Sequence, residues 1–275
     1  MSVGVLAHLF GKMPYKQLAV EVSTHGFKHV QLALWKAVDD YDFNKAGLLN
    51  PGLATDIRET FQKHGVSISV LACYLHLYHK DIVTRRENID RFKELIRYAS
   101  LLGAPVVAAE VGKPSWKVSN EDWNILKSTL EELIEEGEKW GVFVGIEPAN
   151  DHLIDTAASL KHMLEELNSS QIGVVLDPGN LLTAKNFHQQ DQVIEEAFHL
   201  LGDHIVACHA KDRILLEDNS IQTVPPGKGK MNYALYVKLL EQYKPKCNII
   251  MEAAKPYEML ECKYYIEKVQ QAVKD

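Results

Sequence analysis

Residues 142–147 read VFVGIE and residues 172–177 read IGVVLD, two short apolar runs that each end in one carboxylate. Two later segments have the same form: residues 205–209 read IVACH, and residues 248–252 read NIIME. Segments this short and apolar, with charge confined to the last position, are typical of parallel strands that are buried on both faces. They predict four consecutive strands, each with a chemically active side chain at its carboxyl end.

Apolar runs of the same kind occur four more times in the N-terminal half. Amphipathic stretches separate the runs, and Thr84–Leu102 and Ser119–Trp140 carry apolar residues three and four positions apart, as helices do. Gly103 and Gly141 follow these two stretches and fit left-handed helix caps. Eight strand–helix alternations predict a single (β/α)8 TIM barrel domain over residues 1–275, with a doubly wound open sheet as the alternative. The eight predicted strands are Val3–His8, Val30–Leu34, Val66–Ala72, Val106–Ala109, Val142–Ile146, Ile172–Leu176, Ile205–Cys208 and Asn248–Met251.

Composition narrows the class of protein. The net charge of −7 argues against a dedicated nucleic-acid surface, because phosphate binding requires clustered Lys and Arg. The sequence has neither a signal-like N-terminus nor an apolar run of the ~20 residues needed to cross a bilayer. The four cysteines lack CxxC spacing, so we expect them to be reduced thiols. Together, these observations predict a soluble, cytoplasmic protein without nucleic-acid or membrane partners.

The four strand-end residues Glu147, Asp177, His209 and Glu252 form the candidate chemical site. They lie 30, 32 and 43 residues apart, and one βα unit of a barrel takes about 30 residues. Alternation along each strand turns all four side chains toward the barrel axis at the carboxyl end, where barrel enzymes keep their active sites. Three neighbouring carboxylates repel one another, and a cation removes that cost. The oxygen-rich donor set predicts one divalent metal ion, with Mn²⁺ or Mg²⁺ favoured and Zn²⁺ or Co²⁺ as alternatives.

Five short motifs accompany this spacing. They are IEP at 146–148, LDPGN at 176–180, HAKD at 209–212, PGKG at 226–229 and ME at 251–252. In this order they resemble the xylose-isomerase-like barrel superfamily, and within it the sugar phosphate isomerase/epimerase group, over essentially the whole chain.

The resemblance implies that the four strand-end residues hold the metal, and that Glu147 and Glu252 also act as catalytic acid and base. It implies a small sugar or polyol ketone as substrate, a metal-stabilised cis-enediolate as intermediate, and a homodimer or homotetramer as assembly. Relatives often carry Glu in the second strand, in a GFxxVEL pattern. Residues 26–32 read GFKHVQL here, so Gln31 replaces it, and a neutral amide cannot serve as a base.

The nucleolytic, endonuclease IV-like relatives are a poorer match. They need additional His ligands for a three-zinc cluster, and His76 and His79 imitate only part of that set. Asn180 stands where epimerases often have His. We therefore expect no nuclease activity.

Several other residues at strand ends are candidates for contact with substrate. Trp35 has the apolar face that stacks on sugars, and Arg213 has the charge to bind a carboxylate, a phosphate or an enediolate, as does Lys211. The Gly- and Lys-rich loop 224–230 is either a lid or a plain connector. The predicted substrate-binding residues are His8, Trp35, His76, Glu110, Asn180 and Arg213.

The leading hypothesis from the sequence is a metal-dependent isomerase or epimerase. A metal-dependent lyase or dehydratase on a related polyol is the first alternative, because the same enediolate can expel a β-hydroxyl group. A non-catalytic sugar-binding barrel is the second.

Overall fold

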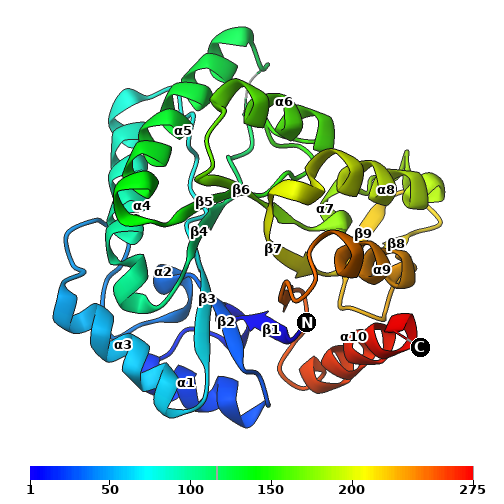
Figure 1. Ribbon diagram of the computed structural model, residues 1–275, viewed down its shortest axis with the longest axis horizontal. Coiled ribbons are helices and arrows are strands. Elements are labelled where there is room, and N and C mark those ends of the chain that lie inside the picture. Colours follow the sequence, from blue (N-terminus) through cyan, green and yellow to red (C-terminus); the bar gives the residue numbers. More distant parts are fainter. Residues whose placement is uncertain (116, 275) are drawn as a thin grey trace.

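Eight parallel strands form a closed barrel inside a ring of helices in the computed structural model, which describes residues 1–115 and 117–274 (Figure 1). The hydrogen-bonded order β1-β10-β7-β6-β5-β4-β3-β2 places each barrel strand beside its neighbours in the chain and closes β10 onto β1. The predicted (β/α)8 fold is therefore confirmed. The barrel strands are β1 (Val3–Leu6), β2 (His29–Leu32), β3 (Ser67–Ala72), β4 (Val106–Ala109), β5 (Phe143–Ile146), β6 (Ile172–Leu176), β7 (Ile205–Ala210) and β10 (Ile249–Met251).

The ends of three predicted strands were wrong by two residues, those of β1, β2 and β7. Strand β7 continues to Ala210 instead of ending at Cys208, so His209 lies within it. The parallel ladder between β1 and β2 ends at the pair Leu6 and Gln31, after which the chain leaves the barrel. His8 consequently lies in the 3-10 helix η1 (Ala7–Phe10), and residue 34 begins the short helix α2 (Leu34–Ala37). Helices thus begin directly at the carboxyl ends of β1 and β2.

An antiparallel hairpin outside the barrel escaped the sequence analysis. Strands β8 (Asp212–Leu215) and β9 (Ile221–Val224) pair with each other alone and follow β7 almost without interruption. Their lengths of four residues and partly exposed faces give little apolar signal.

The two long helices α4 and α5 have caps that fit their sequences. Ser119 and Asp122 form a capping box at the start of α5, and Gly103 and Gly141 take left-handed conformations after α4 and α5. The remaining bounds are α1 (Tyr15–Thr24), α3 (Pro51–Lys63), α4 (Ile82–Leu102), α5 (Asn120–Trp140), α6 (Ala157–Leu167), α7 (Pro178–Leu181), η2 (Phe187–Gln189), α8 (Gln190–Leu201), η3 (Gly202–His204), α9 (Tyr233–Tyr243) and α10 (Met259–Lys274).

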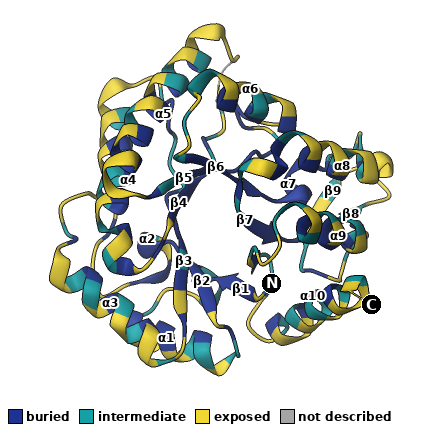
Figure 2. Cartoon of the chain, in the orientation of Figure 1, coloured by how far each residue is buried: buried dark blue, intermediate teal, exposed yellow. Residues whose placement is uncertain are grey.

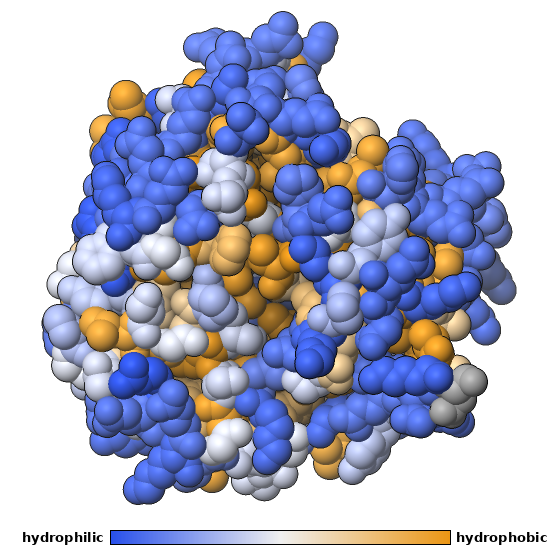
Figure 3. All heavy atoms as spheres, viewed as in Figure 1, coloured by the Kyte–Doolittle hydropathy of each residue, from blue (hydrophilic) through white to orange (hydrophobic). Residues whose placement is uncertain are grey.

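The hydrophobic core has two layers. The larger lies between the strands and the helices, whose buried faces all point toward the barrel (Figure 2). A smaller cluster fills the barrel interior and includes Val175, Ala207 and Ile250. These residues lie two positions before Asp177, His209 and Glu252, so the predicted alternation of strand faces is confirmed. On the face shown in Figure 3, hydrophilic side chains cover the rim, and hydrophobic ones gather near the barrel axis.

None of the helices in the described part of the chain combines the length and the apolar character that a membrane crossing requires.

Candidate metal centre

The structure brings the four predicted ligand residues together at the carboxyl ends of their strands. Each offers one donor atom, and these four atoms lie within 4.8 Å of one another. Ligands held about 2.0–2.2 Å from one ion lie at most about 4.4 Å apart, so closure by a few tenths of an ångström completes a site. Barrel hydrogen bonds fix the register, since the amide of Glu147 donates to Ala109 and that of Glu252 donates to Ala210.

His209 lies between the two glutamates. Its Nδ1 is 2.7 Å from Glu252 Oε1 and 3.2 Å from Glu147 Oε1, and its side chain is fully buried. The nitrogen nearest the carboxylates is therefore Nδ1, and a metal ion between them would bind there. The other nitrogen, Nε2, lies 2.7 Å from Gln31 Oε1 on the opposite side of the ring.

Lys211 also enters the cluster. Its ammonium group donates to Glu252 Oε2 at 2.7 Å and lies 3.1 Å from Asp177 Oδ2. The second contact is an ion pair without hydrogen-bond geometry, which leaves the fully buried Asp177 Oδ2 without a hydrogen-bond donor. Asp177 Oδ1 is satisfied by the amide of Gly179 at 2.7 Å, at the start of α7. The spare Asp177 oxygen is thus an atom that a cation would satisfy.

The charges in the cluster shift one another's protonation. Burial raises the pKa of the Asp177 carboxyl, which Lys211 only partly offsets. Burial acts in the same sense on Glu252, but Lys211 and His209 outweigh it and hold the pKa of that carboxyl well below its usual range. Burial lowers the pKa of His209, and the charges of Glu147 and Glu252 reverse this and raise it well above its ordinary value. Three oxygen donors and one imidazole, mostly buried and accumulating negative charge, fit a divalent metal ion.

Two of the predicted substrate-binding residues have structural partners beside the cluster. Asn180 Nδ2 donates to Glu147 Oε1 at 2.6 Å, so it orients one of the candidate ligands. Arg213 donates from Nε to the carbonyl of Gly179 at 2.7 Å, and its other nitrogens contact Leu182 and Thr223. Its guanidinium thereby ties the β8–β9 hairpin to α7.

Three of the remaining candidates follow strands β1, β3 and β4. Burial, followed by the charge of Lys36, lowers the pKa of His8 to about 4. Burial and the charge of Glu147 raise the pKa of Glu110, which follows β4, to about 7. His76 packs against Gly112 and lies 4.5 and 5.4 Å from the rings of Tyr78 and His79. The substrate roles of these residues stay predictions.

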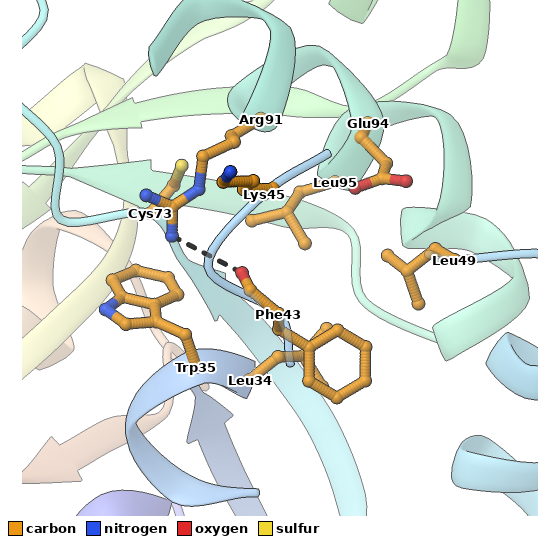
Figure 4. A pocket seen from close by; sticks show the side chains of 9 residues that line it. All are labelled: Leu34, Trp35, Phe43, Lys45, Leu49, Cys73, Arg91, Glu94 and Leu95. Atoms are coloured by element: carbon orange, nitrogen blue, oxygen red, sulfur yellow. Dashed lines mark hydrogen bonds between the residues drawn. The ribbon is translucent and has the colours of Figure 1, made fainter. Parts of the chain in front are cut away.

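Trp35 is one of the residues that line a small pocket (Figure 4). The guanidinium of Arg91 lies 5.1 Å over its ring and donates a hydrogen bond of 3.4 Å to the carbonyl of Phe43. On another side, the ring makes an edge contact with Tyr74, at a centroid distance of 6.4 Å. These contacts hold the Trp35 ring in place. None of the four candidate ligands lines the pocket in Figure 4.

Two further residues of the site have contacts that the sequence does not predict. Gln31, which replaces the glutamate of many relatives, is completely buried inside the barrel and contacts His209. Tyr74 lies beside Gln31 and accepts a hydrogen bond from its Nε2. Strand alternation would have placed Gln31, because it lies between outward-facing Val30 and Leu32. Tyr74 lies beyond the end of β3 at Ala72, so alternation along that strand does not predict its direction.

The loop 224–230 is firmly anchored. The buried carboxylate of Asp212 accepts hydrogen bonds from four backbone amides, those of Arg213, Gly227, Gly229 and Met231, at 2.8–3.1 Å. A side chain at position 229 would collide with Asp212. These contacts favour the connector over the lid among the two predicted roles.

Comparison with known proteins agrees with the barrel fold. The family described as xylose isomerase-like TIM barrel matches residues 20–270. An uncharacterized protein of Methanocaldococcus jannaschii, MJ1311, is 27% identical over 201 residues, which cover 69% of this chain and 66% of that protein. The chain thus spans about two-thirds of the length of this curated relative.

Two solved structures share the fold over nearly their whole length. A D-tagatose 3-epimerase-like protein has a TM-score of 0.79 at 20% identity and covers 100% of this chain and 98% of its own. The IOLI protein, solved with a bound zinc atom, has a TM-score of 0.74 at 19% identity and covers 99% and 98%. At these identities the similarity establishes the shared architecture.

Proposed function

The chain belongs to the xylose isomerase-like TIM barrel family, and within it we propose that it is a metal-dependent isomerase or epimerase of a small sugar or polyol ketone. The observation that supports this most directly is the convergence of Glu147, Asp177, His209 and Glu252 within 4.8 Å. Similar folds with epimerase and zinc-binding descriptions support it further.

Asp177 and His209 act in this proposal as ligands only. The amide of Gly179 at the start of α7 fixes Asp177, and Gln31 fixes His209, so both side chains are held in place to bind a cation. A divalent cation held by these residues would polarise the substrate carbonyl and so acidify the adjacent C–H bond.

Glu147 and Glu252 move the proton. Both carboxylates contact His209 Nδ1, and they follow β5 and β10, two different strands of the barrel. One carboxylate removes the proton from the substrate carbon, and the other returns a proton. Return to the opposite face of the same carbon inverts it, whereas return to the neighbouring carbon moves the carbonyl group. Asn180 and Lys211 orient the two glutamates for these steps.

A proton-exchange screen tests the proposal. Protein stripped with EDTA and protein reloaded with Mn²⁺, Mg²⁺, Zn²⁺ or Co²⁺ are incubated in D₂O with a panel of ketoses and inososes, and the products are read by NMR. We expect metal-dependent deuterium incorporation at one carbon beside the carbonyl, together with an isomeric product. Loss of water would instead indicate the dehydratase alternative. Full activity of the stripped protein, or no exchange with any compound under any metal, would contradict the proposal.

A further inference from the structure

A chain of hydrogen bonds links the candidate metal ligand His209 to a tyrosine at the mouth. His209 Nε2 lies 2.7 Å from Gln31 Oε1, and the amide nitrogen of Gln31 donates to the hydroxyl oxygen of Tyr74. His209 and Gln31 are both fully buried, whereas Tyr74 is partly exposed. The chain therefore runs from the interior of the barrel to the space above it.

The orientation of the Gln31 amide follows from the histidine. If Nδ1 of His209 binds a metal ion, the neutral ring carries its hydrogen on Nε2. If the ring is instead a cation between Glu147 and Glu252, Nε2 carries a hydrogen as well. In both states Nε2 is a donor, so the oxygen of Gln31 must face it, and the NH₂ group must face Tyr74.

This orientation decides the role of the Tyr74 hydroxyl group. Its oxygen accepts from Gln31, so its own hydrogen points elsewhere. Within residues 1–115 and 117–274, the Tyr74 hydroxyl makes no hydrogen bond other than the one it accepts from Gln31. The Tyr74 ring makes edge contacts with His8 and Trp35, at centroid distances of 6.5 and 6.4 Å, and so lies among the predicted substrate-binding residues.

We propose that Gln31 is a positioning residue that aims Nδ1 of His209 at the metal, and that it turns the Tyr74 hydroxyl into a hydrogen-bond donor to a substrate oxygen. This inference rests on the proposed function, since the substrate is the sugar or polyol ketone proposed above. Tyr74 then binds a hydroxyl or carbonyl oxygen on the side of the substrate that faces β1–β4.

The amide is essential to the second effect. A glutamate at position 31 has only acceptors, so it would accept from both His209 and Tyr74. The Tyr74 hydrogen would then point into the barrel, away from the substrate. The neutral Gln31 also adds no further negative charge to a cluster that already has three carboxylates.

Four variants separate the two effects: Gln31→Leu, Gln31→Glu, Tyr74→Phe and the double variant Gln31→Glu/Tyr74→Phe. Tyr264→Phe on the exposed face of α10 is the matched control. Affinity for Mn²⁺ alone is measured by calorimetry on the EDTA-stripped protein, and kcat and KM are measured on the Mn²⁺-loaded protein with the substrate found in the exchange screen.

Gln31→Leu should weaken Mn²⁺ binding by about 10- to 100-fold, as expected when a ligand histidine loses its partner. Tyr74→Phe should keep Mn²⁺ affinity within about twofold and lower kcat/KM by about 10- to 100-fold, the effect of one lost hydrogen bond to substrate. Gln31→Glu should keep Mn²⁺ affinity and lower kcat/KM as Tyr74→Phe does. The double variant should be no worse than either single variant.

Unchanged Mn²⁺ affinity in Gln31→Leu would overturn the positioning of His209. Wild-type kcat/KM in Tyr74→Phe, or additive losses in the double variant, would overturn the donor role of Tyr74. Failure of the proposed function gives a different pattern, because wild-type protein would then exchange no substrate proton, while the Mn²⁺ titration of Gln31→Leu still decides the first effect.

Discussion

The two halves of the barrel mouth present different chemistry. The half built by β5, β6, β7 and β10 holds three carboxylates, an imidazole and an ammonium group, which contact one another and are almost entirely buried. The half built by β1–β4 presents His8, Trp35 and Tyr74, which are partly exposed and touch through their ring edges. A dense cluster of charge is suited to an ion, and an open arrangement of rings is suited to a molecule with apolar and hydroxyl faces. Under the proposed function, the first is the metal half of the mouth and the second is the substrate half.

The largest effect should come from the metal half. Glu252→Gln removes a candidate ligand and a proton-transfer group, so we expect deuterium exchange to fall by about 10²- to 10⁴-fold, together with weaker Mn²⁺ binding. Exchange rates and metal content of the purified variant measure this. Glu258→Gln, six residues further along the chain, is the control and should match wild type. Full exchange activity in Glu252→Gln would break the assignment of this half.

A variant of Asp212 tests whether the loop 224–230 stabilises the fold, although this loop belongs to neither half of the mouth. Asp212→Ala leaves four backbone amides without their acceptor, so we expect the free energy of unfolding to fall by about 2–4 kcal/mol. Urea unfolding of the metal-free protein measures this loss. Asp218→Ala, in the exposed turn between β8 and β9, should cost less than about 1 kcal/mol. Equal stability of the two variants would mean that the loop is not anchored as described.

The metal half could be predicted from sequence, and the substrate half largely could not. Glu147, Asp177 and Glu252 directly follow apolar strands, and the spacing of one βα unit places them at the same end. The types of these residues and their spacing in the sequence therefore both predicted the same site. Metal binding itself remains part of the proposal.

In the substrate half, η1 and α2 begin where strands were expected to continue, so the positions of His8 and Trp35 depend on turns that the apolar pattern does not encode. Aromatic residues such as Tyr74 are ordinary core residues in a sequence, and only three-dimensional contacts distinguish one that borders a site. The entry of Lys211 into the ligand cluster likewise depends on side-chain conformation.

A variant of Trp35 tests whether the two halves of the mouth act independently. Trp35→Ala removes a ring from the substrate half, so we expect KM to rise about tenfold while Mn²⁺ affinity stays within about twofold. Steady-state kinetics and calorimetry measure the two effects separately. Trp140→Ala, on the exposed end of α5, is the control for loss of an indole. A large loss of Mn²⁺ affinity in Trp35→Ala would show that the two halves do not act independently.

Glu110 gives the smallest effect and links the halves, because it follows β4 and lies next to Glu147, which follows the neighbouring strand β5. Burial, and then the charge of Glu147, raise its pKa from 4.5 to about 7. A carboxyl group whose pKa is higher in the folded state binds its proton more tightly there. Its contribution to stability is therefore complete below about pH 4.5 and is lost as the pH rises through about 7.

Glu110→Gln should remove this part of the pH dependence. In EDTA, wild-type protein should lose about 1–2 kcal/mol more stability than the variant between pH 4.5 and 8, a range reduced for the partial exposure of the side chain. Thermal unfolding across this pH range measures the difference, with the exposed Glu59→Gln as control. Saturating Mn²⁺ should shrink the difference, since a cation beside Glu147 cancels the repulsion that raises the pKa of Glu110. If the difference stays the same when Mn²⁺ is added, the two halves are not electrostatically coupled through the metal centre.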